Sequence, residues 1–438
     1  MFDKFRQLIQ KPKTSVSFVQ NVVTLMTGTT FAQVLTIIIM PVLTRIYTPG
    51  DFGILGVYTS IIGILAVICC GRYELAIVLP EEDKDACNLI LVSILWTLIT
   101  ALIILIIVIV GRGWVAFLLK SPRIATWLWL LPINAFCLGL FQTLNYWNTR
   151  FKNYKRLATR QITQSSVTAG VQLSLGFLTK LGAGGLIIGQ LVGLIIAISF
   201  LIKKFIIEDY VSLKLCFSKQ GIIKVAAKYK KYPIYNMLPS ILDSLTIALP
   251  VMFFTKYFDL DIAGQYSLGV KLLYLPASLI GAAVAQVYFQ KIAEEYNKTG
   301  NVTKIVKETC KSLLVIAIPF CLIMMLLGPW LFTFFFGSNW RMAGEFCRIL
   351  APAIALSFVV SPLSRVFGAL DRQEISALWQ VIALVATATS LGISLILQNT
   401  YYSVLLLMLN NILLYSLYLF LIFRVSGVKV KKLFKVVE

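Results

Sequence analysis

The chain contains 438 residues, of which 58% are hydrophobic and only 13% are charged, and its mean hydropathy is +0.85. Because soluble domains carry about 25% charged residues, this composition excludes a soluble enzyme and indicates an integral membrane protein. The chain has no histidine, which excludes histidine-based metal sites and Ser-His-Asp or Cys-His catalysis. The eight cysteines show no C-x-x-C spacing, so we expect buried reduced thiols and no metal site.

Twelve apolar runs follow one another along the chain, each long enough to cross a bilayer, which takes about 20 residues in a helix. They are 19–44, 53–71, 87–110, 125–147, 159–179, 183–202, 234–255, 264–288, 312–336, 346–368, 375–397 and 403–423. The segment before them, 2–13, mixes apolar and basic residues as a short interfacial helix does. The predicted fold is an all-α polytopic membrane protein with 12 transmembrane helices.

The net charge of +21 predicts the orientation of these helices. If the N-terminus lies in the cytoplasm, the cytoplasmic segments hold 30 of the 40 Lys and Arg residues and the external loops hold 7. Cytoplasmic loops of membrane proteins carry such an excess, so both termini are predicted to be cytoplasmic. This distribution places the positive charge beside anionic phospholipids and indicates no nucleic-acid partner.

The chain divides into two halves of six predicted spans each. The predicted parts are an N-terminal lobe (1–206), a basic cytoplasmic linker (207–231) and a C-terminal lobe (232–438). A shift of 211 residues aligns 44–47 with 255–258 and Gly53 with Gly264, at the first external hairpin of each half. An even number of spans per half predicts parallel repeats around a central cavity, which is transporter architecture.

Short sequence matches in both halves point to one known family. They are Pro41-Val-Leu-Thr-Arg45-Ile-Tyr-Thr-Pro49-Gly-Asp-Phe-Gly53, Arg72-Tyr-Glu74-Leu-Ala-Ile-Val-Leu-Pro80, Tyr232-Pro233, Gly264-Gln-Tyr-Ser-Leu and Pro276. They resemble the Wzx-type O-antigen and capsular polysaccharide flippases, in the polysaccharide transporter branch of the multidrug/oligosaccharidyl-lipid/polysaccharide exporter superfamily.

This resemblance implies a transporter and not an enzyme. It implies a flippase that moves an undecaprenyl-diphosphate-linked oligosaccharide from the cytoplasmic to the outer leaflet of the bacterial inner membrane. It also implies work alongside a polysaccharide polymerase and a chain-length regulator. No cofactor is expected, and H⁺ or Na⁺ is the expected coupling ion.

Charges inside spans are the strongest candidates for a binding site, because each costs about 2.5–3.5 kcal/mol at a helix centre and so faces protein or water. Asp243 and Lys271 lie on consecutive spans within roughly 3 Å of the same depth, so they could form an ion pair. Either the pair only locks two helices together, or Lys271 is a cavity cation for the diphosphate and Asp243 is an acid that titrates during coupling.

Five further charged residues have two interpretations each. Arg348 either extends toward the outer interface or lines the outer half of the cavity. Arg45 and Lys256, at equivalent places in the two halves, either stabilise helix C-termini or form an outer cationic ring. Arg72 and Glu74 are either interfacial anchors or an inner gate.

Three other classes of membrane protein are open alternatives to different degrees. A cation-coupled multidrug antiporter of the same superfamily needs acidic groups in its spans. The predicted spans contain one acidic residue, Asp243, and the cations Lys271, Arg348 and Arg365. A lipid-linked peptidoglycan-precursor flippase shares the chemistry, but its family usually has two further spans. A membrane glycosyltransferase or O-antigen polymerase needs an acidic active site, commonly on a long external loop, and no long external loop is predicted.

Overall fold

The computed structural model describes residues 15–206, 218–299, 301–370 and 372–428, and helices are the regular elements of all these segments. The first half contains α2 (Ser15–Ile46), α3 (Pro49–Ile68), η1 (Tyr73–Val78), α4 (Asp83–Leu118), α5 (Pro122–Leu128), α6 (Leu131–Arg150), α7 (Tyr154–Leu178) and α8 (Ala183–Lys204). The second contains α10 (Lys219–Lys228), η3 (Tyr232–Asn236), α11 (Met237–Tyr257), α12 (Leu260–Thr299), α13 (Thr303–Phe336), η4 (Ser338–Trp340), α14 (Arg341–Leu363), α15 (Val366–Ala369), α16 (Gln373–Leu397) and α17 (Thr400–Val425).

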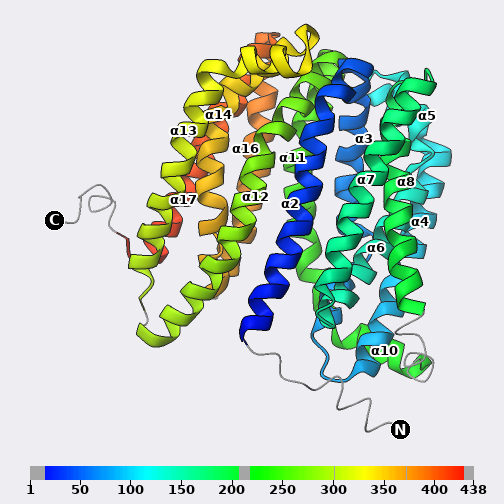
Figure 1. The fold of residues 1–438 in the computed structure, drawn as a ribbon, viewed down its shortest axis with the longest axis vertical. Coiled ribbons are helices and arrows are strands. Elements are labelled where there is room, and N and C mark those ends of the chain that lie inside the picture. The colour runs from blue at the N-terminus through cyan, green and yellow to red at the C-terminus, as the bar shows by residue number, and fades with distance from the viewer. Residues whose placement is uncertain (1–14, 207–217, 300, 371, 429–438) are drawn as a thin grey trace.

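The long helices run side by side along one axis, as in a membrane bundle (Figure 1). Among the described residues, nine helices are long and apolar enough to cross a membrane, and the pair α5–α6 would make a tenth. By length alone α7 and α12 also suffice, with 25 and 40 residues. An all-helical multi-pass architecture is confirmed, whereas the total of twelve spans and the cytoplasmic termini stay predictions.

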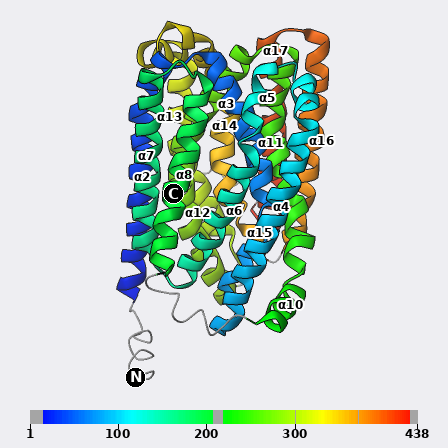
Figure 2. The same cartoon turned by 90° about the vertical axis from the view of Figure 1, so that its right-hand side faces the viewer.

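Two parts of the chain differ from the predicted elements. The fourth predicted span, 125–147, is the pair α5–α6, bent by 49° at the break before Pro132, which occupies the first turn of α6. The predicted linker contains α10, which Ser218 caps and which lies across the ends of the long helices (Figure 2). The predicted interfacial helix 2–13 lies outside the described residues.

The helices form two groups, α2 to α8 and α11 to α17, which meet mainly through α3 packed on α11 and α12 (Figure 1). The α2–α3 and α11–α12 connections lie together at one end, called here the hairpin end, and α10 marks the opposite, α10 end. From the hairpin end α2 and α12 diverge toward the α10 end (Figure 1).

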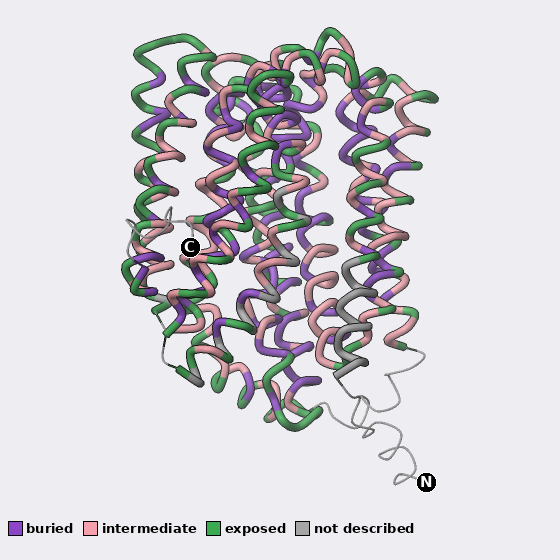
Figure 3. The backbone as a smooth tube through the Cα atoms, turned by 60° about the vertical axis from the view of Figure 1, so that its left-hand side comes forward, coloured by how far each residue is buried: buried purple, intermediate pink, exposed green. Residues whose placement is uncertain are grey.

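Buried apolar side chains show the same asymmetry. The largest buried cluster draws on both groups of helices, with Tyr58 from α3 and Phe254 from α11 among its members. Another cluster belongs to the second half alone. Of the two that belong to the first half, one also includes α10 and residues after it. Buried residues accordingly gather between the helix groups toward the hairpin end (Figure 3). The two groups are packed together at that end and are largely separate at the other.

A close glycine contact brings the two helix groups together at the hairpin end. A Cβ on Gly264 would lie 1.8 Å from the carbonyl oxygen of Pro49, and one on Gly53 would lie 2.0 Å from that of Leu260. No side chain fits such gaps, so α3 and α12 approach backbone to backbone. Gly53 and Gly264 are the residues that the 211-residue shift aligns, and each is the fifth residue of the second helix of its hairpin, where the two helices meet.

Trp340 completes this contact from the η4 turn. Its side chain is fully buried, its indole Nε1 donates a hydrogen bond to the backbone oxygen of Thr44 at 3.0 Å, and its ring meets Phe52 edge-on at 5.0 Å. Gly53, Gly264, Trp340, Phe52 and Thr44 are called the hairpin-end seal below. The seal joins the two helix groups where the cavity described next would otherwise open.

Candidate functional site

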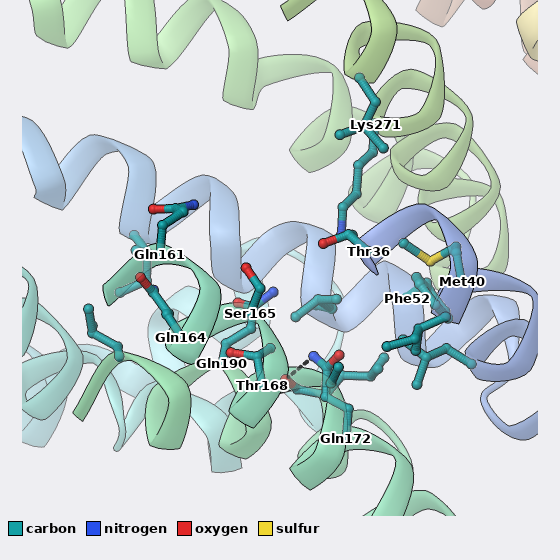
Figure 4. A pocket seen from close by; sticks show the side chains of 18 of the residues that line it. Thr36, Met40, Phe52, Gln161, Gln164, Ser165, Thr168, Gln172, Gln190 and Lys271 are labelled. Carbon is teal, nitrogen blue, oxygen red and sulfur yellow. Dashed lines mark hydrogen bonds between the residues drawn. The ribbon is translucent and has the colours of Figure 1, made fainter. Parts of the chain in front are cut away.

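A cavity of about 420 Å³ lies between α2, α3, α6, α7 and α8, and α12 contributes one side of it (Figure 4). Its wall toward the hairpin end is apolar, with Met40, Leu43 and Phe52 among the lining residues. Its polar lining residues are Thr36, Asn134, Gln161, Gln164, Ser165, Thr168, Gln172, Gln190 and Lys271. A cavity of this size with many neutral polar groups suits a ligand rich in hydroxyl and carbonyl groups.

One face of α7 supplies most of these polar side chains, in a row that Figure 4 shows along the helix. The row is formed by Gln161, Gln164, Ser165, Thr168 and Gln172. Steps of three and four residues along a helix keep side chains on one face. From first to last it extends about 16 Å along the cavity. This face is absent from the predicted site residues, although its spacing is visible in the sequence.

The neighbouring helix α8 makes room for the polar row with small residues. A Cβ on Gly193 would lie 1.9 Å from the Thr168 hydroxyl, and one on Gly189 would lie 2.4 Å from Cγ of Gln172. Small residues four apart let two membrane helices approach closely. The polar groups of α7 are therefore held against α8, and Gln172 also donates through Nε2 to the backbone oxygen of Leu186 at 2.9 Å.

Lys271 of α12 is the single charged side chain among the described residues that line the cavity. It extends from the second helix group toward Thr36 of α2, and its side chain is exposed to the cavity (Figure 4). No ion pair or hydrogen bond of its ammonium group occurs within the described segments. The structure thus places Lys271 in this cavity, facing the polar row of α7.

Asp243 does not join Lys271. Within the described residues no ion pair forms between them at 4.0 Å or less, and Asp243 is not among the cavity-lining residues. Asp243 instead interacts electrostatically with Tyr418 of α17. Equal depth on adjacent helices does not determine the direction of a side chain, and Lys271 extends toward α2 while Asp243 lies on the side of α17.

The three predicted external cations also lie away from the cavity lining. Arg45 and Lys256 occupy the last turns of α2 and α11, where a cation interacts favourably with the helix dipole. Lys256 also lies over the ring of Tyr257, at 5.2 Å from its centroid. Arg348 is an exposed residue of α14 that packs beside Gly328 of α13. The structure brings none of these three together with Lys271.

Arg72 and Glu74 form an ion pair of 3.9 Å in the connection that leads from α3 to α4. Arg72 has a left-handed backbone with φ of 61°, and its side chain keeps 19% exposure, whereas that of Glu74 keeps only 1%. Burial raises the pKa of Glu74 to about 7, and a backbone hydrogen bond and the nearby Arg72 guanidinium oppose this rise only in part. Both residues lie outside the cavity lining, so the predicted inner gate stays a prediction.

Replacing Glu74 with glutamine is expected to change how stability depends on pH. The folded-state pKa of about 7 lies above the ordinary 4.5, so the folded protein binds the proton more tightly. Wild-type stability should therefore fall as pH rises from about 4.5 to about 7, by about 3 kcal/mol in total. Thermal unfolding in detergent between pH 5 and pH 8 measures this, and Glu74→Gln should lose most of the fall. Parallel pH profiles for both proteins would contradict the assignment.

Arg160 is a further buried charge, at the start of the predicted span 159–179. In the structure it belongs to α7, is 7% exposed and lies directly before the polar row. Arg160 is absent from the predicted site residues, and its burial is visible only in the fold. As for metals, no group of three Cys, Asp or Glu side chains suited to an ion occurs in the described part of the chain.

Comparison with known proteins finds one matching family model and several solved structures of similar fold. A family model for polysaccharide biosynthesis proteins matches residues 42–345. No curated protein matches the chain significantly. The fold is similar to an inward-facing multidrug resistance MATE family transporter of the MOP superfamily, with TM-score 0.70, 16% identity and coverage of 92% of this chain and 96% of that chain.

Two other solved structures share the fold. The lipid II flippase MurJ, in an inward closed conformation, has TM-score 0.71 and 16% identity over 94% of this chain and 89% of its own. A MOP superfamily transporter from Pyrococcus furiosus has TM-score 0.63 and 15% identity over 94% of this chain and 99% of its own. At sequence identities of 15–16%, the similarity to these structures establishes the fold of this chain and no more. The family match covers most of the chain and confirms the resemblance drawn from the sequence, so the chain belongs to the polysaccharide biosynthesis protein family.

Proposed function

We propose that the protein is a flippase that moves an undecaprenyl-diphosphate-linked oligosaccharide from the cytoplasmic to the outer leaflet of the bacterial inner membrane. The observation that carries this proposal is the chemistry of the cavity. Among the described lining residues one cation, Lys271, faces a row of neutral amide and hydroxyl groups, and no carboxylate lines the cavity. An anionic diphosphate with an attached glycan needs a cation and neutral hydrogen-bonding groups of this kind.

The energetics favour Lys271 as the group that binds the diphosphate. A charge drawn through hydrocarbon is costly, and a counter-charge about 4 Å away recovers about 4 kcal/mol at an intermediate effective dielectric constant. Sugar hydroxyls lose hydrogen bonds to water in the same step, and the polar row of α7 can replace them. The apolar tail needs no such group, because it can stay in the lipid.

The shape of the helix bundle supports alternating access. With the predicted orientation, the hairpin end is external and the α10 end is cytoplasmic. The hairpin-end seal then closes the external side while the two helix groups diverge toward the cytoplasm (Figure 1). Transport would proceed by opening the seal and closing the α10 end, with both helix groups moving as units. Coupling to H⁺ or Na⁺ through Asp243, contact with anionic phospholipids, and work with a polymerase and a chain-length regulator stay proposals.

A multidrug antiporter is the main alternative, because MATE transporters have the same fold. A cationic drug would be bound by carboxylates in the cavity, and none of the described lining residues carries one. The enzyme alternative, a glycosyltransferase or polymerase, finds no support in the fold or the family. The lipid-linked oligosaccharide therefore fits the cavity better than a cationic drug does.

Lys271→Met is expected to reduce surface polysaccharide to background in a flippase-deleted strain that the wild-type protein complements. The variant keeps most of the side-chain volume and removes the charge that neutralises the diphosphate. Surface polysaccharide is measured at matched membrane expression, with Arg348→Met as the control because Arg348 lies outside the cavity lining. Full activity of Lys271→Met would contradict the proposed role. Failure of the wild type with several lipid-linked donors, together with lowered drug sensitivity, would favour the antiporter.

A further inference from the structure

Arg160 has surroundings that are unusual for a buried cation. It is 7% exposed, and no carboxylate lies within ion-pair distance in the described part of the chain. Its guanidinium lies over the ring of Phe141, at 4.6 Å from the centroid, and Nη2 donates to Oδ1 of Asn145 at 3.0 Å. Amide oxygens and an aromatic face thus take the place of a counter-ion.

The remaining hydrogen bonds of Arg160 reach the polar row itself. Nη1 donates to Oε1 of Gln161 at 2.8 Å and to Oε1 of Gln164 at 3.3 Å. An arginine has only donors, so each glutamine must turn its oxygen toward the guanidinium. The amide nitrogen of each then points away from Arg160. Both glutamines line the cavity, and because their oxygens are turned toward Arg160, the groups that they present to the cavity are N–H donors.

We propose that Arg160 is a positioning residue that fixes the amide groups of Gln161 and Gln164, so that they form a donor-only subsite for a carbonyl oxygen on the transported sugar. This inference rests on the proposed flippase function and adds the specificity of its glycan site. The carbonyl belongs either to an acetamido group or to a sugar carboxylate, since both present oxygens that only accept.

The discrimination follows from what a free glutamine could do. A glutamine without Arg160 could rotate its amide and offer either oxygen or nitrogen, and a sugar hydroxyl can pair with both because it donates and accepts. A carbonyl oxygen can pair with the nitrogen alone. Holding both amides in one orientation takes away the acceptor to which a sugar hydroxyl would donate, so the hydroxyl keeps only one of its two hydrogen bonds, whereas a carbonyl keeps its pairing in full. The fixed amides therefore favour sugars with a carbonyl over sugars with hydroxyls only. One such hydrogen bond corresponds to a preference of about fivefold to tenfold.

The experiment measures binding of four lipids to the purified full-length protein in detergent. They are undecaprenyl diphosphate alone and the same lipid carrying glucose, N-acetylglucosamine or glucuronic acid. The variants are Arg160→Met, which releases the amides, and the double variant Gln161→Leu/Gln164→Leu, which removes them and leaves Arg160 in place. Lys155→Met is the control, because Lys155 is an exposed cation on the same helix and outside the cavity lining.

The wild type and Lys155→Met should bind at least one carbonyl-bearing sugar lipid about fivefold to tenfold more tightly than the glucose lipid. Both test variants should bring that ratio to within twofold of one and leave binding of undecaprenyl diphosphate unchanged. If Arg160 had only a structural role, Arg160→Met would instead weaken the binding of all four lipids to a similar extent. Which sugar is preferred distinguishes the acetamido group from the carboxylate.

Equal binding of the three sugar lipids by the wild type would overturn the inference, and so would a preference that survives in both variants. Lys271→Met tests the proposed function separately in the same assay. This variant should weaken the binding of all four lipids, including the lipid without sugar. If it binds undecaprenyl diphosphate as the wild type does, the proposed diphosphate site is wrong, whatever the sugar ratios show.

Discussion

Valine in place of Gly264 is expected to stop transport and to leave the protein open at its hairpin end. Any Cβ at this position would lie 1.8 Å from the carbonyl oxygen of Pro49 and 2.8 Å from the backbone nitrogen of Gly53. Backbone atoms cannot rotate away as a flexible side chain can, so α3 and α12 must separate. Because the two helix groups meet backbone to backbone at the seal, we expect transport to fall more than about a hundredfold, which corresponds to about 2.7 kcal/mol.

Two measurements test the Gly264 prediction. Transport is compared with that of Gly63→Val, since Gly63 lies on α3 and no atom comes within 4 Å of its Cβ position. In a background without native cysteines, Ser267→Cys reports on the seal, because the Ser267 hydroxyl is buried beside Gly56. A membrane-impermeant maleimide should label it from outside much faster when Gly264 is replaced. Wild-type transport and slow labelling in Gly264→Val would show that the seal does not depend on this glycine.

Trp340→Ala is expected to weaken the same seal by loss of packing. Truncation of a fully buried tryptophan costs about 3–5 kcal/mol, and here it also leaves the Thr44 carbonyl without its indole donor. The lost contacts are largely those that join the two helix groups through Phe52 and Thr44. The substitution therefore destabilises the conformation that is closed at the hairpin end more than the open one. The ratio of closed to open protein should decrease at least about a hundredfold.

The Trp340 prediction is tested by measuring the labelling rate of the same Ser267→Cys reporter and the amount of surface polysaccharide. Trp330→Ala is the matched control, because Trp330 is also near the hairpin end, on α13, but is 59% exposed. Trp340→Phe should give an intermediate labelling rate, since it keeps a ring against Phe52 and loses only the hydrogen bond. Equal labelling in Trp340→Ala and Trp330→Ala would contradict a role for Trp340 in closure.

Several features of this protein follow from the sequence alone. Mean hydropathy and charge content require a membrane protein, because a surface so poor in charge cannot be solvated. Long apolar runs predict the helices closely, as 183–202 against α8 and 375–397 against α16 show. The 211-residue shift singles out Gly53 and Gly264, which meet in the seal. Each of these signals is a local property of the chain.

The composition of the candidate site was decided by the tertiary structure. Hydropathy summed over a span reports that a helix crosses the membrane, and it does not report which face of that helix meets a cavity. That direction depends on packing between helices distant in sequence, which separates Asp243 from Lys271 and places Lys271 opposite the polar row of α7. It also buries Arg160, because α6 supplies Phe141 and Asn145 from outside its own helix.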